Sequence, residues 1–286
     1  MGKKAIVIGS GFAGLSAASF LAKAGWEVEV LEKHDQPGGR CRHFKTEGFS
    51  FDMGPSWYWM PDVFDRFFGC FGKKVSDYYD LIRLEPSYRI YWEQNKMDVP
   101  SDYAALKKMF DQLEPGAGNQ LDAFMAEAEY KYRVGVNKLV FKPGQSLLEF
   151  LDKELIAGLF RLDVFNNIKS HIGKFFKHPQ LRQMMEFPVL FLGALPENTP
   201  ALYSLMNYAD VKLGTWFPRG GMYKIVEGMH KLAVEQGATF HFNHNVSSII
   251  VENDIAKTVV ADNGKQFHAD VVIGGADYHF VETKLL

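Results

Sequence analysis

The chain opens with short apolar segments whose spacing changes from that of a strand to that of a helix and back. Residues 5–8 (Ala-Ile-Val-Ile) form an apolar run with the length and composition of a buried strand. Residues 15–24 place small and apolar side chains at helical spacing, and Gly25 ends that segment. Residues 28–31 (Val-Glu-Val-Leu) form a second strand. The pattern therefore predicts a strand–helix–strand unit at the start of the chain.

Three glycines in the spacing G-x-G-x-x-G lie between the first strand and the helix. In this context Gly9 allows a tight turn, Gly11 lets a pyrophosphate approach the backbone, and Gly14 lets helix and strand pack closely. The start of the helix then presents free N–H groups and the positive end of its dipole to the phosphates. The residues predicted to contact a dinucleotide here are Gly9, Ser10, Gly11, Phe12, Ala13 and Gly14.

Glu32 stands at the tip of the second predicted strand and is followed by Lys33. A carboxylate at this position can accept hydrogen bonds from ribose hydroxyls, and its charge would repel the 2′-phosphate of an NADP-type ligand. The glycine motif alone is a weak signal, but strand, glycines, helix, second strand and acidic residue here agree in spacing. We therefore expect a dinucleotide site that includes Glu32 and Lys33.

A second pair of glycines, Gly38 and Gly39, precedes Arg40. The glycines bring the backbone close to the ligand again, and Arg40 can pair with a phosphate or cover the ring system. At this point the chain resembles the superfamily of FAD-dependent amine oxidases and carotenoid desaturases, in which an acidic strand end is followed by a Gly-Gly-Arg segment. The resemblance implies FAD rather than NAD as the cofactor.

A sharp turn follows the next predicted strand. Residues 49–52 (Phe-Ser-Phe-Asp) form that strand, and Gly54 with Pro55 breaks it. A simple β-turn would account for this pair, but carotenoid desaturases carry a similar F-x-x-D-x-G-P segment. The resemblance implies a corner that aims main-chain groups at the flavin, and it adds Gly54, Pro55 and Ser56 to the expected cofactor site.

Residues 62 to about 200 differ in character, because helical patterns, aromatic residues and scattered basic residues predominate. Helices are expected over 119–140 and 146–159. Residues 160–177 carry an apolar stripe at steps of three and four with a largely basic opposite side. A core-facing helix explains this stripe, and so does a helix that lies in a membrane interface. The apolar run at 187–196 favours membrane contact or a hydrophobic tunnel, although it is too short to span a bilayer.

The strand and glycine pattern returns near the end of the chain. Residues 216–222 resemble the F-P-x-G-G-M segment of carotenoid desaturases and precede a predicted helix over 223–236. Short strands follow, with a hairpin turn predicted at residues 262–264 (Asp-Asn-Gly). In flavoproteins of this superfamily, a residue matching Val246 supplies backbone contacts to the adenine. Members of the family continue well beyond residue 286, so we expect this chain to be the N-terminal part of a longer enzyme.

Composition narrows the possible functions. Of the 286 residues, 47% are hydrophobic and 14% aromatic, which favours a pocket or surface for apolar material. The net charge of −2 gives no global basic field, so no nucleic-acid partner is expected. Cys41 and Cys70 lack metal-binding spacing, and His241 and His244 lie three apart in a predicted strand and would face opposite sides. We therefore expect no metal site. The sequence also contains no apolar run of about 18 residues, the length needed to span a membrane.

Together these patterns predict an α/β fold. A Rossmann-like FAD-binding domain (a βαβ unit plus a β-meander) would occupy residues 1–60 and 200–286, and an inserted, mostly helical domain for substrate and membrane association would occupy 61–199. The resemblance to phytoene desaturases implies FAD-dependent desaturation of an apolar carotenoid precursor by hydride transfer to the flavin, with catalytic acids or bases unidentified. An amine oxidase-like enzyme and a non-catalytic isoprenoid- or lipid-binding escort protein of the same fold remain alternatives. The expected location is cytoplasmic, with peripheral association at the inner face of the membrane.

Overall fold

The computed structural model describes residues 2–142, 145–146 and 162–286. The chain divides into two compact units, which we name the sheet unit and the helical unit. The sheet unit comprises Met1–Tyr58, Asp62–Ile82 and Phe217–Leu286, and the helical unit comprises Trp59–Pro61 and Arg83–Trp216. The chain passes between the units at both ends of Trp59–Pro61, within β5 (Leu81–Arg83) and within β8 (Trp216–Pro218).

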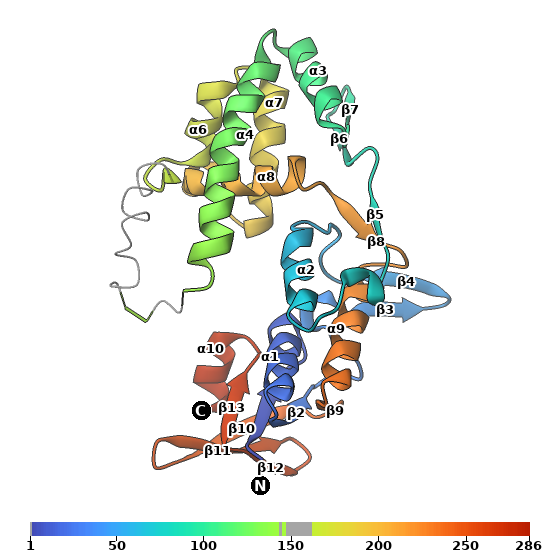
Figure 1. Cartoon of the computed structure of the whole chain (residues 1–286), viewed down its shortest axis with the longest axis vertical. Coiled ribbons are helices and arrows are strands. Elements are labelled where there is room, and N and C mark those ends of the chain that lie inside the picture. The colour runs from blue at the N-terminus through green and yellow to red at the C-terminus, as the bar shows by residue number, and fades with distance from the viewer. Residues whose placement is uncertain (1, 143–144, 147–161) are drawn as a thin grey trace. The chain divides into compact units, whose positions relative to one another are not determined.

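A parallel sheet of four strands organises the sheet unit (Figure 1). Its strands and first helix are β1 (Lys4–Ile8), α1 (Phe12–Lys23), β2 (Glu27–Leu31), β9 (Thr239–His241) and β13 (Val271–Gly274). The strand order is β13–β1–β2–β9, and all three pairings are parallel. The strand–helix–strand unit predicted from the sequence is therefore confirmed. Because both faces of β1 are covered, it reads in the sequence as a continuous apolar run.

Each face of this sheet has its own covering layer. On one face, Ala5 and Val7 pack with α1 and with α9 (Tyr223–Glu235). On the other face, Ile6 and Ile8 pack with residues of an antiparallel meander. The meander consists of β10 (Val246–Glu252), β11 (Ile255–Ala261) and β12 (Gln266–His268). The hairpin turn predicted at residues 262–264 is confirmed, since the N–H of Gly264 donates to the carbonyl of Ala261 at 2.8 Å.

The sheet unit also contains a hairpin and a helix that follow β2 in the chain, and a short helix that follows β13. β3 (His43–Thr46) and β4 (Phe49–Asp52) form an antiparallel hairpin, and α2 (Pro61–Gly69) follows it. After β13 the chain forms the short helix α10 (Tyr278–Phe280). The hairpin is exposed on its strands, and Phe44 and Phe51 lie opposite each other on one of its faces.

The helical unit is built around α4, which packs with three of its other helices. Its helices are α3 (Tyr103–Leu113), α4 (Ala117–Val134), α6 (Ile168–Phe175), α7 (Pro179–Glu186) and α8 (Leu205–Val211), and its hairpin is β6 (Tyr88–Tyr91) with β7 (Lys96–Val99). Figure 1 shows α6 beside α4, and α6 also packs with α7. The helix predicted over 119–140 is present as α4, extended by a π-helical turn over Gly135–Leu139.

The amphipathic helix predicted over 160–177 is shorter than expected. Residues 160 and 161 lie outside the described residues, as does the helix predicted over 146–159. α6 begins only at Ile168, because the side chain of Asn167 accepts a hydrogen bond from the N–H of Ser170 at 2.8 Å and caps the first turn. Ile168, Ile172 and Phe176 are fully buried. The part of the stripe that lies on α6 therefore faces the core of the helical unit, which is the core-facing alternative of the prediction.

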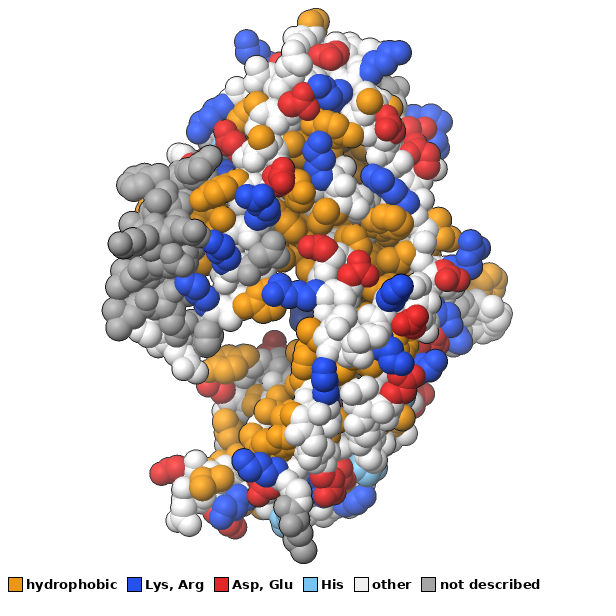
Figure 2. Space-filling model, in the orientation of Figure 1, with side chains coloured by type: hydrophobic (Ala, Val, Ile, Leu, Met, Phe, Trp, Pro, Cys, Tyr) orange, Lys and Arg blue, Asp and Glu red, His pale blue; other side chains and the backbone are white. Residues whose placement is uncertain are grey.

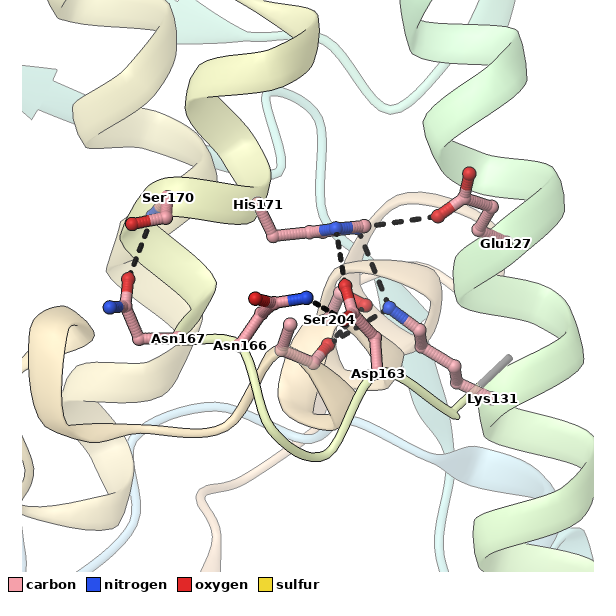
Figure 3. A network of polar contacts seen from close by, with 9 residues as sticks. Glu127, Lys131, Asp163, Asn166, Asn167, Ser170, His171 and Ser204 are labelled. Carbon is pink, nitrogen blue, oxygen red and sulfur yellow. Dashed lines mark hydrogen bonds and ion pairs between the residues drawn. The ribbon is translucent and has the colours of Figure 1, made fainter. Parts of the chain in front are cut away.

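A buried polar network joins α4 to α6 (Figure 3). Lys131 of α4 is fully buried, and its Nζ lies 3.4 Å from Nε2 of His171 and donates to the carbonyl of Ala201 at 3.1 Å. On the other side of the ring, Nδ1 of His171 lies 3.0 Å from a carboxylate oxygen of Asp163, and Nε2 also lies 3.4 Å from Glu127. Since Nε2 faces the ammonium group, the neutral ring carries its proton on Nδ1, toward Asp163.

This network makes the stability of the helical unit depend on pH. Burial and the adjacent Lys131 ammonium lower the pKa of His171 to about 4, against the opposing effect of Asp163. A histidine in the unfolded chain titrates near 6.5, so the unfolded chain binds more protons between these pH values. The stability that neutral His171 contributes is therefore intact above pH 6.5 and is lost as the pH falls toward 4.

We predict that His171→Gln reduces the pH dependence of the free energy of unfolding between pH 6.5 and 4. One histidine can contribute up to about 1.4 kcal/mol per pH unit in this window, and glutamine takes up no proton. Denaturant unfolding across the pH range measures the slope. The exposed His279→Gln serves as the control and should keep the parent slope. An unchanged slope in His171→Gln would contradict the assignment.

Candidate functional site

The turn after β1 brings the start of α1 against the strand end. Gly9 has a φ of +90°, a conformation that favours glycine, and its N–H donates to the carbonyl of Leu31 at 2.8 Å. A Cβ on Gly14 would overlap the carbonyl oxygen of Gly9. Gly14 is therefore required by the backbone contact between helix and turn, as the motif predicts.

Gly11 differs from its two neighbouring glycines. Its φ of −71° is open to any residue, and a Cβ there would meet no atom within 4 Å. It is also the residue at the N-cap position of α1, so no side chain caps the N–H groups of the first turn. Open space beside uncapped N–H groups at a helix start suits a phosphate or pyrophosphate group.

Glu32 is buried at the end of β2, only 3% exposed, and serves the fold as well as the predicted site. One carboxylate oxygen accepts the N–H of Ser10 at 2.8 Å and its hydroxyl at 2.6 Å. The other oxygen accepts the N–H of His34 at 3.0 Å. A carboxylate offers about four acceptor positions, so one is left for a ribose hydroxyl. The side chain of Ser10 is directed to Glu32, and a ligand would meet Ser10 through its backbone.

The second glycine segment packs directly on the first. The N–H of Gly38 donates to the carbonyl of Ser10 at 2.8 Å, and a Cβ on Gly39 would lie 3.2 Å from Cα of Gly11. Arg40 is exposed beside this contact. A Cβ on Gly54 would overlap the carbonyl oxygen of Arg40. The three glycine segments predicted separately from the sequence, Gly9–Gly14, Gly38–Arg40 and Gly54, therefore meet in one place, which we name the cradle.

The other predicted residues lie around this cradle in different ways. Phe12 and Ala13 are exposed on the first turn of α1, and Lys33, Pro55 and Ser56 are exposed as well. Val246 is different, since its side chain is buried among the residues between sheet and meander. A ligand at Val246 would therefore meet the backbone, which is the contact that the resemblance implies.

One contributor to the cradle is absent from the predicted set. Gly275 follows β13, and a Cβ on it would lie 3.0 Å from the carbonyl of Ile8 and 3.1 Å from Cα of Gly14. Its N–H donates to the carbonyl of Ile8 at 2.9 Å. The glycine pair at 274–275, placed directly after a predicted strand, is the sequence signal that identifies it.

A polar pocket of about 480 Å³ adjoins this region within the sheet unit. One face of the β3–β4 hairpin lines it with Lys45, Ser50 and Asp52, and the start of α9 lines the opposite side with Tyr223 and Lys224. Its charged lining does not suit a hydrocarbon ligand.

The two neighbouring histidines of the sheet unit do not face opposite sides, contrary to the sequence-based expectation. β9 ends at His241, and the following turn brings the ring of His244 within 5.5 Å of it, centroid to centroid. Nε2 of His241 lies 2.6 Å from Glu29, and Nδ1 of His244 lies 2.7 Å from the carbonyl of Phe242. Across residues 2–142, 145–146 and 162–286, no three potential metal ligands gather into a group.

In the same described ranges, no helix combines the length and the apolar character needed to cross a bilayer. This finding is compatible with the sequence, which lacks a long apolar run.

The parallel sheet with its glycine cradle defines a nucleotide-binding flavoprotein class, and the family model agrees. The chain belongs to the family of flavin-containing amine oxidoreductases, whose model matches residues 12–282. Open space at Gly11, the uncapped start of α1 and the spare acceptor on Glu32 fit FAD, which is the cofactor of this family's fold.

Curated relatives match over the whole chain. A carotenoid 3,4-desaturase of Haloarcula japonica is 40% identical over 100% of this chain and 58% of its own length. A zeta-carotene-forming phytoene desaturase of Myxococcus xanthus is 32% identical over 100% of this chain and 55% of its own length. The chain thus spans little more than half the length of these relatives. Among solved structures, the PF1083 protein of Pyrococcus furiosus has a TM-score of 0.64 at 20% identity, covering 99% of this chain and 61% of that one.

We predict that alanine at the second and third glycines of the motif separates binding from stability. Gly11→Ala should leave the melting temperature of the apoprotein unchanged and weaken FAD binding at least about ten-fold, because its methyl group occupies the open space. Gly14→Ala should lower the melting temperature, because its Cβ overlaps the Gly9 carbonyl. Thermal unfolding and flavin fluorescence titration measure the two effects, and equal FAD affinity of Gly11→Ala and parent would contradict the assignment.

Proposed function

We propose that this protein is an FAD-dependent oxidoreductase that desaturates a carotenoid precursor of the phytoene type. The observation that carries the proposal is the 40% identity over the whole chain to a carotenoid 3,4-desaturase. The gathering of Glu32, Gly39 and Arg40 around the turn after β1 supports the proposal.

Because the proposed substrate is a hydrocarbon, the cofactor would accept the hydride and the protein would bind and align the chain. FAD supplies a hydride acceptor at its isoalloxazine ring. A polyene precursor has no carbonyl to polarise, so the protein must align a long apolar chain and exclude water rather than supply a strong acid or base. In this proposal Gly11 and the start of α1 hold the pyrophosphate, Glu32 holds the ribose, and the corner at Gly54 and Pro55 faces the flavin.

The helical unit is the proposed substrate-binding and membrane-associating domain, inserted between the two parts of the FAD-binding domain. Apolar exposure supports this role. Leu190, Phe191, Leu192 and Leu195 are each 44–55% exposed along a short stretch of sequence. We name residues 187–195 the apolar segment. A water-facing surface rarely exposes so many large apolar side chains together without a partner.

One ring of the apolar segment packs on a tryptophan that is itself held by hydrogen bonds. The rings of Trp59 and Phe191 meet edge to face at 5.1 Å between centroids. The indole N–H of Trp59 donates to the hydroxyl of Thr215 at 2.8 Å, and that hydroxyl donates to Asp210 at 2.9 Å. Tyr88 donates to the same carboxylate at 2.8 Å. Burial raises the pKa of Asp210 to about 6. Trp59 is thus tied to the helical unit by hydrogen bonds at the point where it contacts Phe191.

A lipid surface is the partner proposed for the apolar segment. Carotenoid precursors are insoluble hydrocarbons that reside in bilayers, so the enzyme must dock there to collect them. Lys169 of α6 lies 3.6 Å from Glu197, just after the segment, and Lys174 and Lys177 are exposed nearby along the chain. Figure 2 shows Lys and Arg intermixed with Asp and Glu on the face drawn, so attraction to anionic lipid would rest on local lysines rather than on a broad field.

The redox proposal is tested by anaerobic reduction of the bound flavin. We expect loss of visible flavin absorbance on mixing the FAD-loaded protein with a phytoene-type polyene in detergent or vesicles, and none with amines. Bleaching by amines alone would instead assign an amine oxidase-like enzyme. Binding of the polyene without bleaching would favour a non-catalytic escort protein.

The docking proposal is tested by vesicle sedimentation. A Leu190→Ser, Leu192→Ser, Leu195→Ser variant should bind anionic vesicles at least about ten-fold more weakly, since each buried leucine contributes about 1.5–3 kcal/mol. Lys169→Glu with Lys174→Glu and Lys177→Glu should weaken the salt-dependent part of binding. The matched control is serine at Ile250, Val251 and Ile255, which are also exposed but lie in the meander. Equal loss in control and test variants would refute the assigned surface.

A further inference from the structure

The hairpin after the Gly-Gly-Arg segment carries a carboxylate that contacts a distant helix. In the pairing of β3 with β4, Asp52 lies opposite His43. The two carboxylate oxygens of Asp52 accept the N–H of Met222 at 2.9 Å and the N–H of Tyr223 at 3.2 Å. Met222 is the N-cap residue of α9 and Tyr223 is its first residue, and they follow Asp52 by 170 and 171 positions in the sequence.

α9 has no cap of its own at this end. Its N-cap residue is Met222, whose side chain makes no capping hydrogen bond. The two residues before it, Gly220 and Gly221, have φ of +95° and +104°. A Cβ on Gly221 would lie 3.2 Å from an oxygen of Asp52. Asp52 therefore supplies the cap that the local sequence lacks, and its charge complements the helix dipole.

The contacts around Asp52 connect the β3–β4 hairpin, α9 and the Gly38–Arg40 segment of the cradle to one another. From β4 the chain runs to Gly54, which packs on the carbonyl of Arg40. Gly38, at the start of the same segment, meets Val226 of α9, since a Cβ on Gly38 would lie 3.1 Å from that side chain. Asp52 joins α9 back to β4. The hairpin, α9 and the Gly-Gly-Arg segment are thus fixed to one another by contacts at three points.

We propose that Asp52 is a positioning residue for FAD, which sets the Gly38–Arg40 segment and the Gly54 corner against the turn after β1. Asp52 acts through α9 and the hairpin rather than by contact with the cofactor. The inference rests on the FAD site described above, and it assigns to the aspartate of the F-x-x-D-x-G-P segment a role beyond that of a helix cap.

The first test measures the apoprotein and needs no cofactor. Hydrogen–deuterium exchange should become faster at residues 38–41 in Asp52→Ala, although the hydrogen bonds of the Asp52 carboxylate go to Met222 and Tyr223. A cap with a local role alone would raise exchange only at residues 222–225, and that result would overturn the proposal. Ser50→Ala, on the same face of the hairpin and lining the same pocket, should exchange like the parent.

The second test measures FAD affinity by fluorescence titration and the visible circular dichroism of the bound flavin. Asp52→Ala should bind FAD at least about ten-fold more weakly, with an altered flavin spectrum. Asp52→Asn keeps one acceptor oxygen and should recover affinity to within about three-fold of the parent. Should Asp52→Ala not fold, Asp52→Ser, whose shorter side chain offers one hydroxyl in place of two carboxylate oxygens, replaces it in the comparison with Asn. Parent-like affinity and spectrum in Asp52→Ala would overturn the inference alone, whereas failure of the parent to bind FAD would overturn the proposed function with it.

Discussion

Direct contact between backbones is the constraint on which the cofactor site depends. At Gly14 against the Gly9 carbonyl, and at Gly54 against the Arg40 carbonyl, two main chains approach with no room for a side chain. At Gly275 the approach is slightly wider, since a Cβ there would lie 3.0 Å from the Ile8 carbonyl. Such contacts fix distances more firmly than side chains do, because a backbone has no rotamers to exchange. The cradle is therefore formed by the fold itself, and a ligand would not have to order it.

A buried carboxylate then ties this backbone arrangement to recognition of the ligand. Removing Glu32 from water is costly, and the cost is offset by three donors, of which two come from Ser10 in the glycine turn. The same residue that would hold the ribose thus also holds the turn that would hold the pyrophosphate. A change at Glu32 would consequently alter fold and binding together, while Gly11 is the position where the two effects separate.

The sequence predicts those parts of the structure in which the determining residues are neighbours along the chain. The β1–α1–β2 unit and the turn at residues 262–264 depend on a few consecutive residues, and both are recognisable from them. The contact from Asp52 to α9 spans 170 residues, and no local pattern announces it. The apolar stripe of α6 is ambiguous for another reason: its period gives the buried face, but burial against protein and burial in lipid leave the same pattern.

Buried charged side chains are stabilised differently in the two units. Backbone N–H groups surround them in the sheet unit, and other titratable side chains surround them in the helical unit. In the sheet unit, Glu32 and Asp52 accept backbone N–H groups, so each charge is matched by donors that the fold would otherwise leave unsatisfied. In the helical unit, Lys131 is fully buried; the carboxylates of Asp163 and Glu127 favour its charge, and a neutral His171 adds no second positive charge beside it. A second positive charge on that ring would face the ammonium at 3.4 Å. Protonation of His171 would therefore oppose the packing of α6 against α4, the two helices that this network joins.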